Sequence, residues 1–359
     1  MINLFAQKWY NIAMSSSKKY TIEYKGQRLD TDLWTPLSDE EFSKARDEYF
    51  AKPDVSEVLE QLKSVANGGT KINLIGRYYF RDLMAKVKLR FNKWTIEDVY
   101  ECKQLMEHLA AKIAKNTKVY PPEWSLHRKL YKCFSIAGKG VASPPTQFNI
   151  KDVDSVLSKY NVNGNYYDFS CGWGVRLMGA LRNKVNYFGT DPNDILCERL
   201  NQLEGDWRSV SPSESTVDIR CQGSEVLVPE WVGKMGVSFS SPPYFDLEDY
   251  KIGEGQSYKE GMEYKDWCRN YVVPTLMNIH KYLVDGGYFV LNLKNPKIGQ
   301  PLLDHWTEFA KRVGFQFVGQ DVVKVKTRCF GRTDGAGAYN EHNGDEPMYV
   351  FQKQKGTTT

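Results

Sequence analysis

The second half of the chain alternates short apolar runs with helical patterns, and this alternation restricts the fold most. Apolar runs typical of strands lie at 165–169, 186–190, 217–221, 235–240 and 287–293. Helical patterns between or after them cover 173–183, 193–203, 264–283 and 304–314. Strands that alternate with helices predict βαβ units and a doubly wound, mostly parallel sheet.

Two further runs, 315–325 and 346–353, have no helix between them, so we expect an antiparallel pair at one edge of the sheet. The sheet then has seven strands. Pro274 lies inside the long helical pattern 264–283 and should kink it, because proline lacks the N–H of a helical hydrogen bond.

A glycine-containing loop follows the first strand, in the stretch DFSCGWG (168–174). Gly172 and Gly174 let the backbone pass close to a ligand at the carboxyl end of the sheet. The third glycine of a GxGxxG dinucleotide fingerprint would fall at Leu177 and is absent, which argues against NAD. No GxxxxGK[ST] motif is present, which excludes a P-loop.

Acidic residues follow the second and third strands. Asp191 comes about twenty residues after the glycine loop, where an acid can accept hydrogen bonds from both ribose hydroxyls. Helix capping is the alternative role for Asp191. Glu225 follows the third strand and can face an adenine amino group or lie on the surface. The loop and Asp191 together indicate an adenosine-type cofactor.

The fourth strand ends in SFSSPPYF (238–245). A Pro-Pro turn presents carbonyl groups without competing N–H donors, so Ser241 and Pro242 can accept hydrogen bonds from an exocyclic NH₂ group. Tyr244 can stack on a planar ring beside them. The structural alternative is a simple exit from the strand, with the aromatic residues packed on the core.

These segments, in this order, resemble class I S-adenosylmethionine-dependent amino-methyltransferases that act on DNA, above all the DNA methylases of phages and mobile elements. DFSCGWGVRLMGA, GTDPN and SSPPYF resemble their cofactor loop, ribose-binding acid and catalytic motif. GKGVASPPTQF resembles the segment that completes the methionine side of the pocket, and GGYFVLNLKN also fits. The resemblance covers about 130–353 and implies a Rossmann-like fold, with a seven-stranded, mostly parallel sheet and an antiparallel edge strand.

The resemblance also implies the site residues and the cofactor, S-adenosyl-L-methionine, with no metal. The cofactor pocket would be formed by Thr146, Phe148, Asp168, Ser170, Gly172, Gly174, Asp191 and Glu225. The target base would be held by the catalytic residues Ser241, Pro242, Pro243 and Tyr244, with Phe245 as a further wall.

The expected reaction is methylation of the adenine N6 or cytosine N4 amino group in DNA. Two features depart from the family pattern: Ser241 replaces Asp or Asn, and the glycine motif precedes the proline motif, which is the reverse of a large subgroup that reads SPPY. Methylation at cytosine C5 is excluded, because Pro243 occupies the position that needs a cysteine nucleophile. An RNA methyltransferase (guanine-N2 or adenine-N6) and a non-enzymatic binding protein are the alternatives.

The first part of the chain reads as a mainly helical domain (1–125), followed by a catalytic domain (126–355). Ser38 and Glu41 have the spacing of a capping box before one helix, and 53–67 reads as a second. Apolar residues at threes and fours from Leu74 to Ala114, including Leu83, Val87 and Phe91, predict two or three amphipathic helices.

Between Lys71 and Lys151 the chain carries 16 basic and 6 acidic residues. This excess is typical of a solvated helical face or of a surface that contacts phosphates. The candidate nucleic-acid contacts are Lys86, Lys88, Arg90 and Lys93, and DNA is the expected partner, with RNA as the alternative.

The remaining composition indicates a cytoplasmic protein of a bacterial or phage-infected cell, without a membrane partner. No apolar stretch reaches the length of a membrane span, and the N-terminus lacks the features of a secretory signal. The seven cysteines form no CxxC pair and no cluster with metal-ligand spacing, so we expect reduced thiols.

Overall fold

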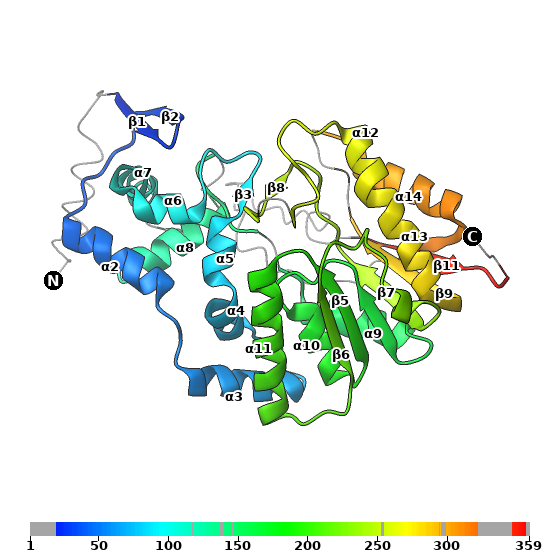
Figure 1. Ribbon diagram of the computed structural model, residues 1–359. Coiled ribbons are helices and arrows are strands. Elements are labelled where there is room, and N and C mark those ends of the chain that lie inside the picture. Colours follow the sequence, from blue (N-terminus) through cyan, green and yellow to red (C-terminus); the bar gives the residue numbers. More distant parts are fainter. Residues whose placement is uncertain are drawn as a thin grey trace.

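The protein is built on one seven-stranded sheet with the order β10-β11-β9-β7-β4-β5-β6 (Figure 1). The computed structural model describes residues 19–116, 118–136, 140–145, 147–252, 255–293, 295, 299–321 and 347–356. The strands of this sheet are β4 (Asn165–Asp168), β5 (Asn186–Asp191), β6 (Val217–Cys221), β7 (Met235–Ser240), β9 (Leu283–Asn292), β10 (Phe315–Asp321) and β11 (Met348–Lys353).

The predicted α/β fold is confirmed: the sheet is Rossmann-like, of the class I methyltransferase type, and mostly parallel. Strands β4, β5, β6, β7 and β9 pair in parallel, whereas β11 pairs antiparallel with both β9 and β10. The antiparallel pair therefore forms one edge, with β11 inserted between β9 and β10. Residues 322–325 of the predicted strand lie outside the described residues.

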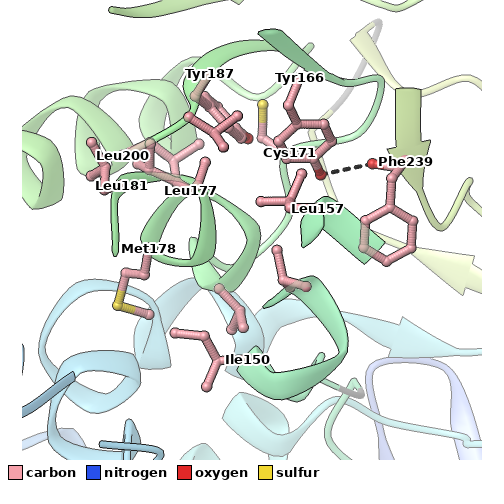
Figure 2. Packing of buried hydrophobic residues seen from close by; sticks show 14 of the residues in the cluster. Ile150, Leu157, Tyr166, Cys171, Leu177, Met178, Leu181, Tyr187, Leu200 and Phe239 are labelled. Atoms are coloured by element: carbon pink, nitrogen blue, oxygen red, sulfur yellow. Dashed lines mark hydrogen bonds between the residues drawn. The ribbon is translucent and has the colours of Figure 1, made fainter. Parts of the chain in front are cut away.

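Alternate residues of the central strands feed two separate cores, because successive side chains of a strand point to opposite faces. Tyr166 belongs to the core beneath α9 (Ile150–Tyr160), α10 (Val175–Arg182) and α11 (Asp194–Val210). Its neighbour Tyr167 belongs to the core beneath α13 (Val273–Tyr282) and α14 (Leu302–Val313). Figure 2 shows the first core, where the Tyr166 hydroxyl donates a 2.7 Å hydrogen bond to the carbonyl of Phe239 on β7.

The long helical pattern 264–283 is interrupted where proline was expected to disturb it. It comprises α12 (Tyr264–Trp267), the π-helical turn η3 (Cys268–Val272) and then α13, with Pro274 in its first turn. Proline cannot donate to the carbonyl four residues earlier, and a π-turn is one way to rearrange the bonds around such a gap. The kink expected at Pro274 stays a prediction, and the structure shows a π-turn directly before α13.

A third core joins most of the N-terminal elements. It takes residues from the hairpin β1 (Tyr20–Tyr24) and β2 (Gln27–Thr31), and from α2 (Asp39–Phe50), α5 (Arg81–Lys86), α6 (Ile96–Glu101), α7 (Lys103–Ala114) and α8 (Leu126–Ile136). The capping box of Ser38 and Glu41 is confirmed at the start of α2. The β1–β2 hairpin is an addition to the predicted helices.

Two N-terminal helices belong instead to the core of the sheet. Helices α3 (Val55–Ala66) and α4 (Asn73–Tyr79) contribute side chains such as Leu62 and Ile75 to the core beneath α9–α11. Figure 1 shows α3 and α4 close to α11, and α5, which follows α4 directly, leads the chain towards the third core. The N-terminal part is therefore anchored on the seven-stranded sheet and its helices through the apolar faces of α3 and α4.

A short strand pair also links the two parts. Strand β3 (Lys88–Leu89) pairs antiparallel with β8 (Glu248–Asp249), a few residues after the proline motif. The prediction of a helix that continues to Phe91 is wrong. Helix α5 ends at Lys86, and Phe91 lies in a turn and is 60% exposed. A 3₁₀ turn, η1 (Pro229–Trp231), precedes β7. No helix in the described part of the chain is long and apolar enough to cross a membrane.

Candidate active site

A cavity of about 560 Å³ lies at the carboxyl ends of β4, β5, β6 and β7. The chain runs outward from β4 to β6 and then returns to β7 on the other side of β4, so this is the switch point of the sheet, where α/β folds bind ligands. The predicted residues that line it are Phe148, Ser170, Gly172, Asp191, Glu225, Ser241, Pro242, Pro243 and Tyr244.

The Asp191 carboxylate is held at the rim by two backbone amides. The amide of Asn193 donates to Oδ1 at 3.1 Å and that of Gly172 to Oδ2 at 3.4 Å. Burial raises the pKa of Asp191 to about 6, although both amides favour the charged form. Asn193 caps α11, so the capping alternative for Asp191 does not apply.

Glu225 is a desolvated acceptor at the β6 side of the cavity. Its Oε2 atom is buried and accepts no hydrogen bond from the described residues, and burial raises the pKa of its carboxyl. The preceding residue is fixed, because the Ser224 hydroxyl bonds to that of Thr275 at 2.9 Å and the Ser224 carbonyl accepts from Asn278. A buried carboxylate oxygen without a donor is suited to a ligand N–H group.

The proline motif faces the glycine loop across the cavity. The Ser240 hydroxyl donates to the carbonyl of Ser170 at 3.2 Å, which ties the end of β7 to the loop after β4. Neither the Ser241 nor the Pro242 carbonyl accepts a hydrogen bond from another described residue. Both therefore remain available to a donor in the cavity, with Tyr244 beside them.

Three of the predicted site residues that the structure describes do not line the cavity: Gly174, Phe245 and Asp168. Gly174 adopts φ 74°, and a Cβ there would come within 2.7 Å of Leu203 and 3.0 Å of Phe80, so this glycine permits core packing. The ring of Phe245 packs against Tyr258, Tyr264 and Trp267 and is 7% exposed, which corrects its expected place as a wall for the base. Thr146 lies outside the described residues.

Asp168, the third of these residues, is buried beneath the loop. Its Oδ2 accepts from Arg176 Nε at 2.8 Å and from the Tyr187 hydroxyl at 2.9 Å. Arg176 also donates to the carbonyl of Ser170, so the Asp168–Arg176 ion pair stabilises the position of the glycine loop. Asp168 therefore supports the cavity without facing it.

Arg176 is the main site residue that the motif analysis missed. It lines the cavity, and its guanidinium lies 4.4 Å from the centre of the Phe148 ring. Its Nε and Nη2 atoms have acceptors, whereas Nη1 has none among the described residues. A cation in the first turn of a helix is unfavourable next to the positive end of the helix dipole. The position of Arg176 in the sequence could therefore have indicated that it needs an acidic partner.

Aromatic residues form the rest of the enclosure. Trp173 and Tyr250 line it and contact each other, with ring centres 6.3 Å apart, and Tyr271 lines it from the π-turn. Tyr250 is fixed by Gln256 at its amide (2.7 Å) and by Glu248 at its hydroxyl (2.6 Å). Across the described ranges, no three His, Cys, Asp or Glu side chains are grouped to hold a metal ion.

Comparisons with known proteins bear on the fold. No protein-family model matches the sequence, and no curated protein matches it. Similar solved structures include a putative S-adenosylmethionine-dependent methyltransferase from Listeria monocytogenes, with 11% identity over 57% of this chain and 96% of that chain, and a TM-score of 0.37. Another is magnesium protoporphyrin IX methyltransferase from Synechocystis with bound S-adenosylmethionine. It has 10% identity over 57% of this chain and 79% of that chain, and a TM-score of 0.37.

A third similar structure is the N-methyltransferase NodS from Bradyrhizobium japonicum, with 13% identity over 57% of this chain and 93% of that chain, and a TM-score of 0.36. Sequence identities this low can indicate only a similar fold, and TM-scores this low do not strengthen the assignment of the fold. The class of fold follows from the strand order of this chain, and its chemistry from the residues around the cavity.

Proposed function

We propose that this protein is an S-adenosylmethionine-dependent methyltransferase that methylates the exocyclic amino group of adenine (N6) or cytosine (N4) in DNA. One observation carries the proposal: a single cavity is lined both by the carboxylates Asp191 and Glu225 and by the Ser241–Tyr244 motif. The same cavity therefore contains hydrogen-bond acceptors suited to an adenosine and further acceptors suited to a second ring that carries an amino group.

The cavity residues fit the chemistry of this cofactor. Asp191, held by two amides, would accept hydrogen bonds from the ribose hydroxyls, and the unpartnered Oε2 of Glu225 would accept from the adenine amino group. A ligand with its adenosine on the β5–β6 side extends its amino-acid part back towards β4 and β7, where Arg176 and Phe148 lie. Arg176, the only cation among the described lining residues, would pair with the carboxylate of that part.

The proline motif would then orient the nucleophile. When bound, the cofactor would supply an electrophilic methyl group on its sulfonium. The carbonyls of Ser241 and Pro242 would accept from the target NH₂ and direct its nitrogen towards that carbon, while Tyr244 stacks on the ring. The nitrogen, held by these carbonyls, would release its proton to water after the methyl group is transferred, so the site would need no strong general base.

DNA as the substrate is supported by the basic segment near the cavity. Lys86 and Lys93 are exposed, and Lys88 lies on the strand pair that adjoins the loop after Tyr244. Arg90 pairs with Asp246 at 3.0 Å and Lys93 donates to the carbonyl of Arg28, so these two cations are partly committed to the protein. RNA carries the same phosphates and amino groups and remains the second candidate.

The decisive experiment incubates the purified protein with labelled S-adenosylmethionine and equal amounts of DNA, tRNA and rRNA, followed by nucleoside analysis. N6-methyladenine or N4-methylcytosine in DNA is the expected product. An Asp191→Ala, Tyr244→Ala double variant is the matched control for contaminating activity. Label in RNA alone would reverse the choice of substrate, and calorimetry that detects no cofactor binding would favour a non-enzymatic protein on the same fold.

A further inference from the structure

The turn that carries Phe91 lies at the mouth of the cavity and is fixed there. The amide of Asn92 donates to the carbonyl of Leu89 at 2.9 Å, which closes a tight turn with Arg90 and Phe91 at its tip. Leu89 and Phe91 both line the cavity, and yet Phe91 is 60% exposed, the largest exposed fraction among the large apolar side chains of the described residues.

Both sides of this turn are bonded to neighbouring loops, and one of these loops lines the cavity. On one side, the amide of Arg90 donates to the carbonyl of Leu247 at 2.8 Å, and the amide of Leu247 donates to the carbonyl of Tyr244 at 3.0 Å. On the other side, Asn92 accepts from the amide of Gly140 at 3.1 Å. The turn therefore has a fixed position relative to Tyr244, with one residue between them in this chain of backbone bonds.

A single exposed apolar side chain is common on a protein surface, but Phe91 also lines the cavity, on a turn that is bonded to the loop after Tyr244. The three cores take aliphatic and aromatic side chains from neighbouring elements, but none of them includes Phe91. Lys86, Lys88, Arg90 and Lys93 flank it in the sequence, so a polyanion that approached the cavity would meet an aromatic ring among cations. Bases that leave a helical stack are commonly received by such rings.

We infer that Phe91 stacks on the nucleobase next to the one that enters the cavity, and so makes the enzyme act on a polynucleotide in preference to a free nucleoside. This inference rests on the proposed function. Removal of one base from a duplex stack exposes the faces of its neighbours, and an aromatic ring at the mouth would cover one of them. Phe91 would be a positioning residue: it would contact the polymer at the mouth of the cavity, while Tyr244 holds the target base.

The test compares Phe91→Ala, Phe91→Trp and the control Phe317→Ala, which removes another exposed aromatic ring, on the edge strand β10 and outside the cavity lining. Three quantities are measured: the affinity for S-adenosylhomocysteine, kcat/KM on a DNA or RNA oligonucleotide, and kcat/KM on the free nucleoside. Phe91→Ala should lose about five- to a hundredfold in kcat/KM on the oligonucleotide, with the other two quantities unchanged. Phe91→Trp should restore the loss, and Phe317→Ala should show none.

Each other outcome has a distinct meaning. An unchanged rate of Phe91→Ala on the oligonucleotide would overturn the inference and leave the proposed function intact. An equal loss in the affinity for S-adenosylhomocysteine would assign Phe91 to the cofactor pocket and also overturn it. If the wild-type protein methylates only the RNA oligonucleotide, and Phe91→Ala loses activity on it, the stacking role would be supported and DNA would be rejected as the substrate. A wild-type protein that binds the cofactor product but methylates no nucleic acid would overturn both proposals.

Discussion

The Nε atom of Arg176 donates a 2.8 Å hydrogen bond to the carboxylate of Asp168, and both side chains are buried below the glycine loop. Removal of one partner leaves a buried charge uncompensated, so we expect Arg176→Met or Asp168→Asn to lower the free energy of unfolding by about 3–5 kcal/mol. The double variant should lose much less than the sum of the two. Urea unfolding of the three variants measures this coupling, and additive losses would contradict it.

The same pair allows a test of what Arg176 does for the cofactor. Wild type and Asp168→Asn keep the guanidinium, whereas the double variant with Arg176→Met lacks it without leaving a buried charge. Calorimetry with S-adenosylhomocysteine and with its analogue lacking the carboxyl group should show a preference for the carboxylate of about tenfold or more in the first two proteins. The preference should disappear in the double variant, and its persistence would assign the carboxylate to another group.

Asp191 should make cofactor binding depend on pH. With a pKa of about 6, the carboxyl is mostly ionised at pH 7 and mostly protonated at pH 5, and only the ionised form offers both oxygens to the ribose. Affinity for S-adenosylhomocysteine should therefore fall by up to about tenfold from pH 7 to pH 5.

Two variants isolate this effect. Asp191→Asn should bind more weakly at pH 7 and lose the pH dependence, and Asp191→Ala should cost about 1–3 kcal/mol of binding free energy. Glu225→Gln is the control, because the pKa of Glu225 is also raised by burial. An unchanged pH profile in Asp191→Asn would transfer the titration to another group.

Tyr244 should affect the substrate step and leave the cofactor step unchanged. Loss of the stacking ring in Tyr244→Ala should lower kcat/KM by about five- to a hundredfold, with near-normal affinity for S-adenosylhomocysteine. Tyr244→Phe keeps the ring and should retain most of the activity. Equal losses in activity and cofactor affinity for Tyr244→Ala would indicate that the side chain serves mainly to hold the fold.

The basic segment should contribute a salt-dependent share of nucleic-acid binding. Because Arg90 and Lys93 already have partners on the protein, Lys86→Ala with Lys88→Ala should account for most of the loss seen when all four cations are replaced. Binding measured between 50 and 200 mM salt should show a shallower dependence in the double variant. If even the quadruple variant binds like wild type at low salt, the segment is a solvated face.

The sheet could be predicted from the sequence because its strands are short apolar runs separated by helices, a pattern that tertiary contacts reinforce. The antiparallel pair followed from the missing helix between the last two runs. The insertion of β11 between β9 and β10 did not, because strand order depends on which edge offers the better apolar surface, and no local signal in the chain reports that.

The site could be predicted less completely. Asp191 and Ser241–Tyr244 follow buried strands, and strand ends have a fixed place on the sheet. Asp168 and Gly174 belong to the glycine motif but serve the packing beneath it. Asp168 pairs with Arg176 of the same motif, whereas Gly174 makes room for Phe80 and Leu203, which lie in segments that the motif does not include. Phe91 fitted a helical repeat, although backbone pairing with the loop after Tyr244 replaced the helix there.

The π-turn at Cys268–Val272 changes the phase of the helix that contains it. Each residue of an α-helix advances about 100°, so the residue accommodated by a π-turn offsets the two flanking segments by that angle. Trp267 on one segment and Leu276 on the other can thus both face the core, while Tyr271 between them reaches the cavity. A deletion of one residue in this turn would rotate α12 against α13 and displace the Tyr271 ring, so the shape of the cavity would change although no lining residue had been substituted.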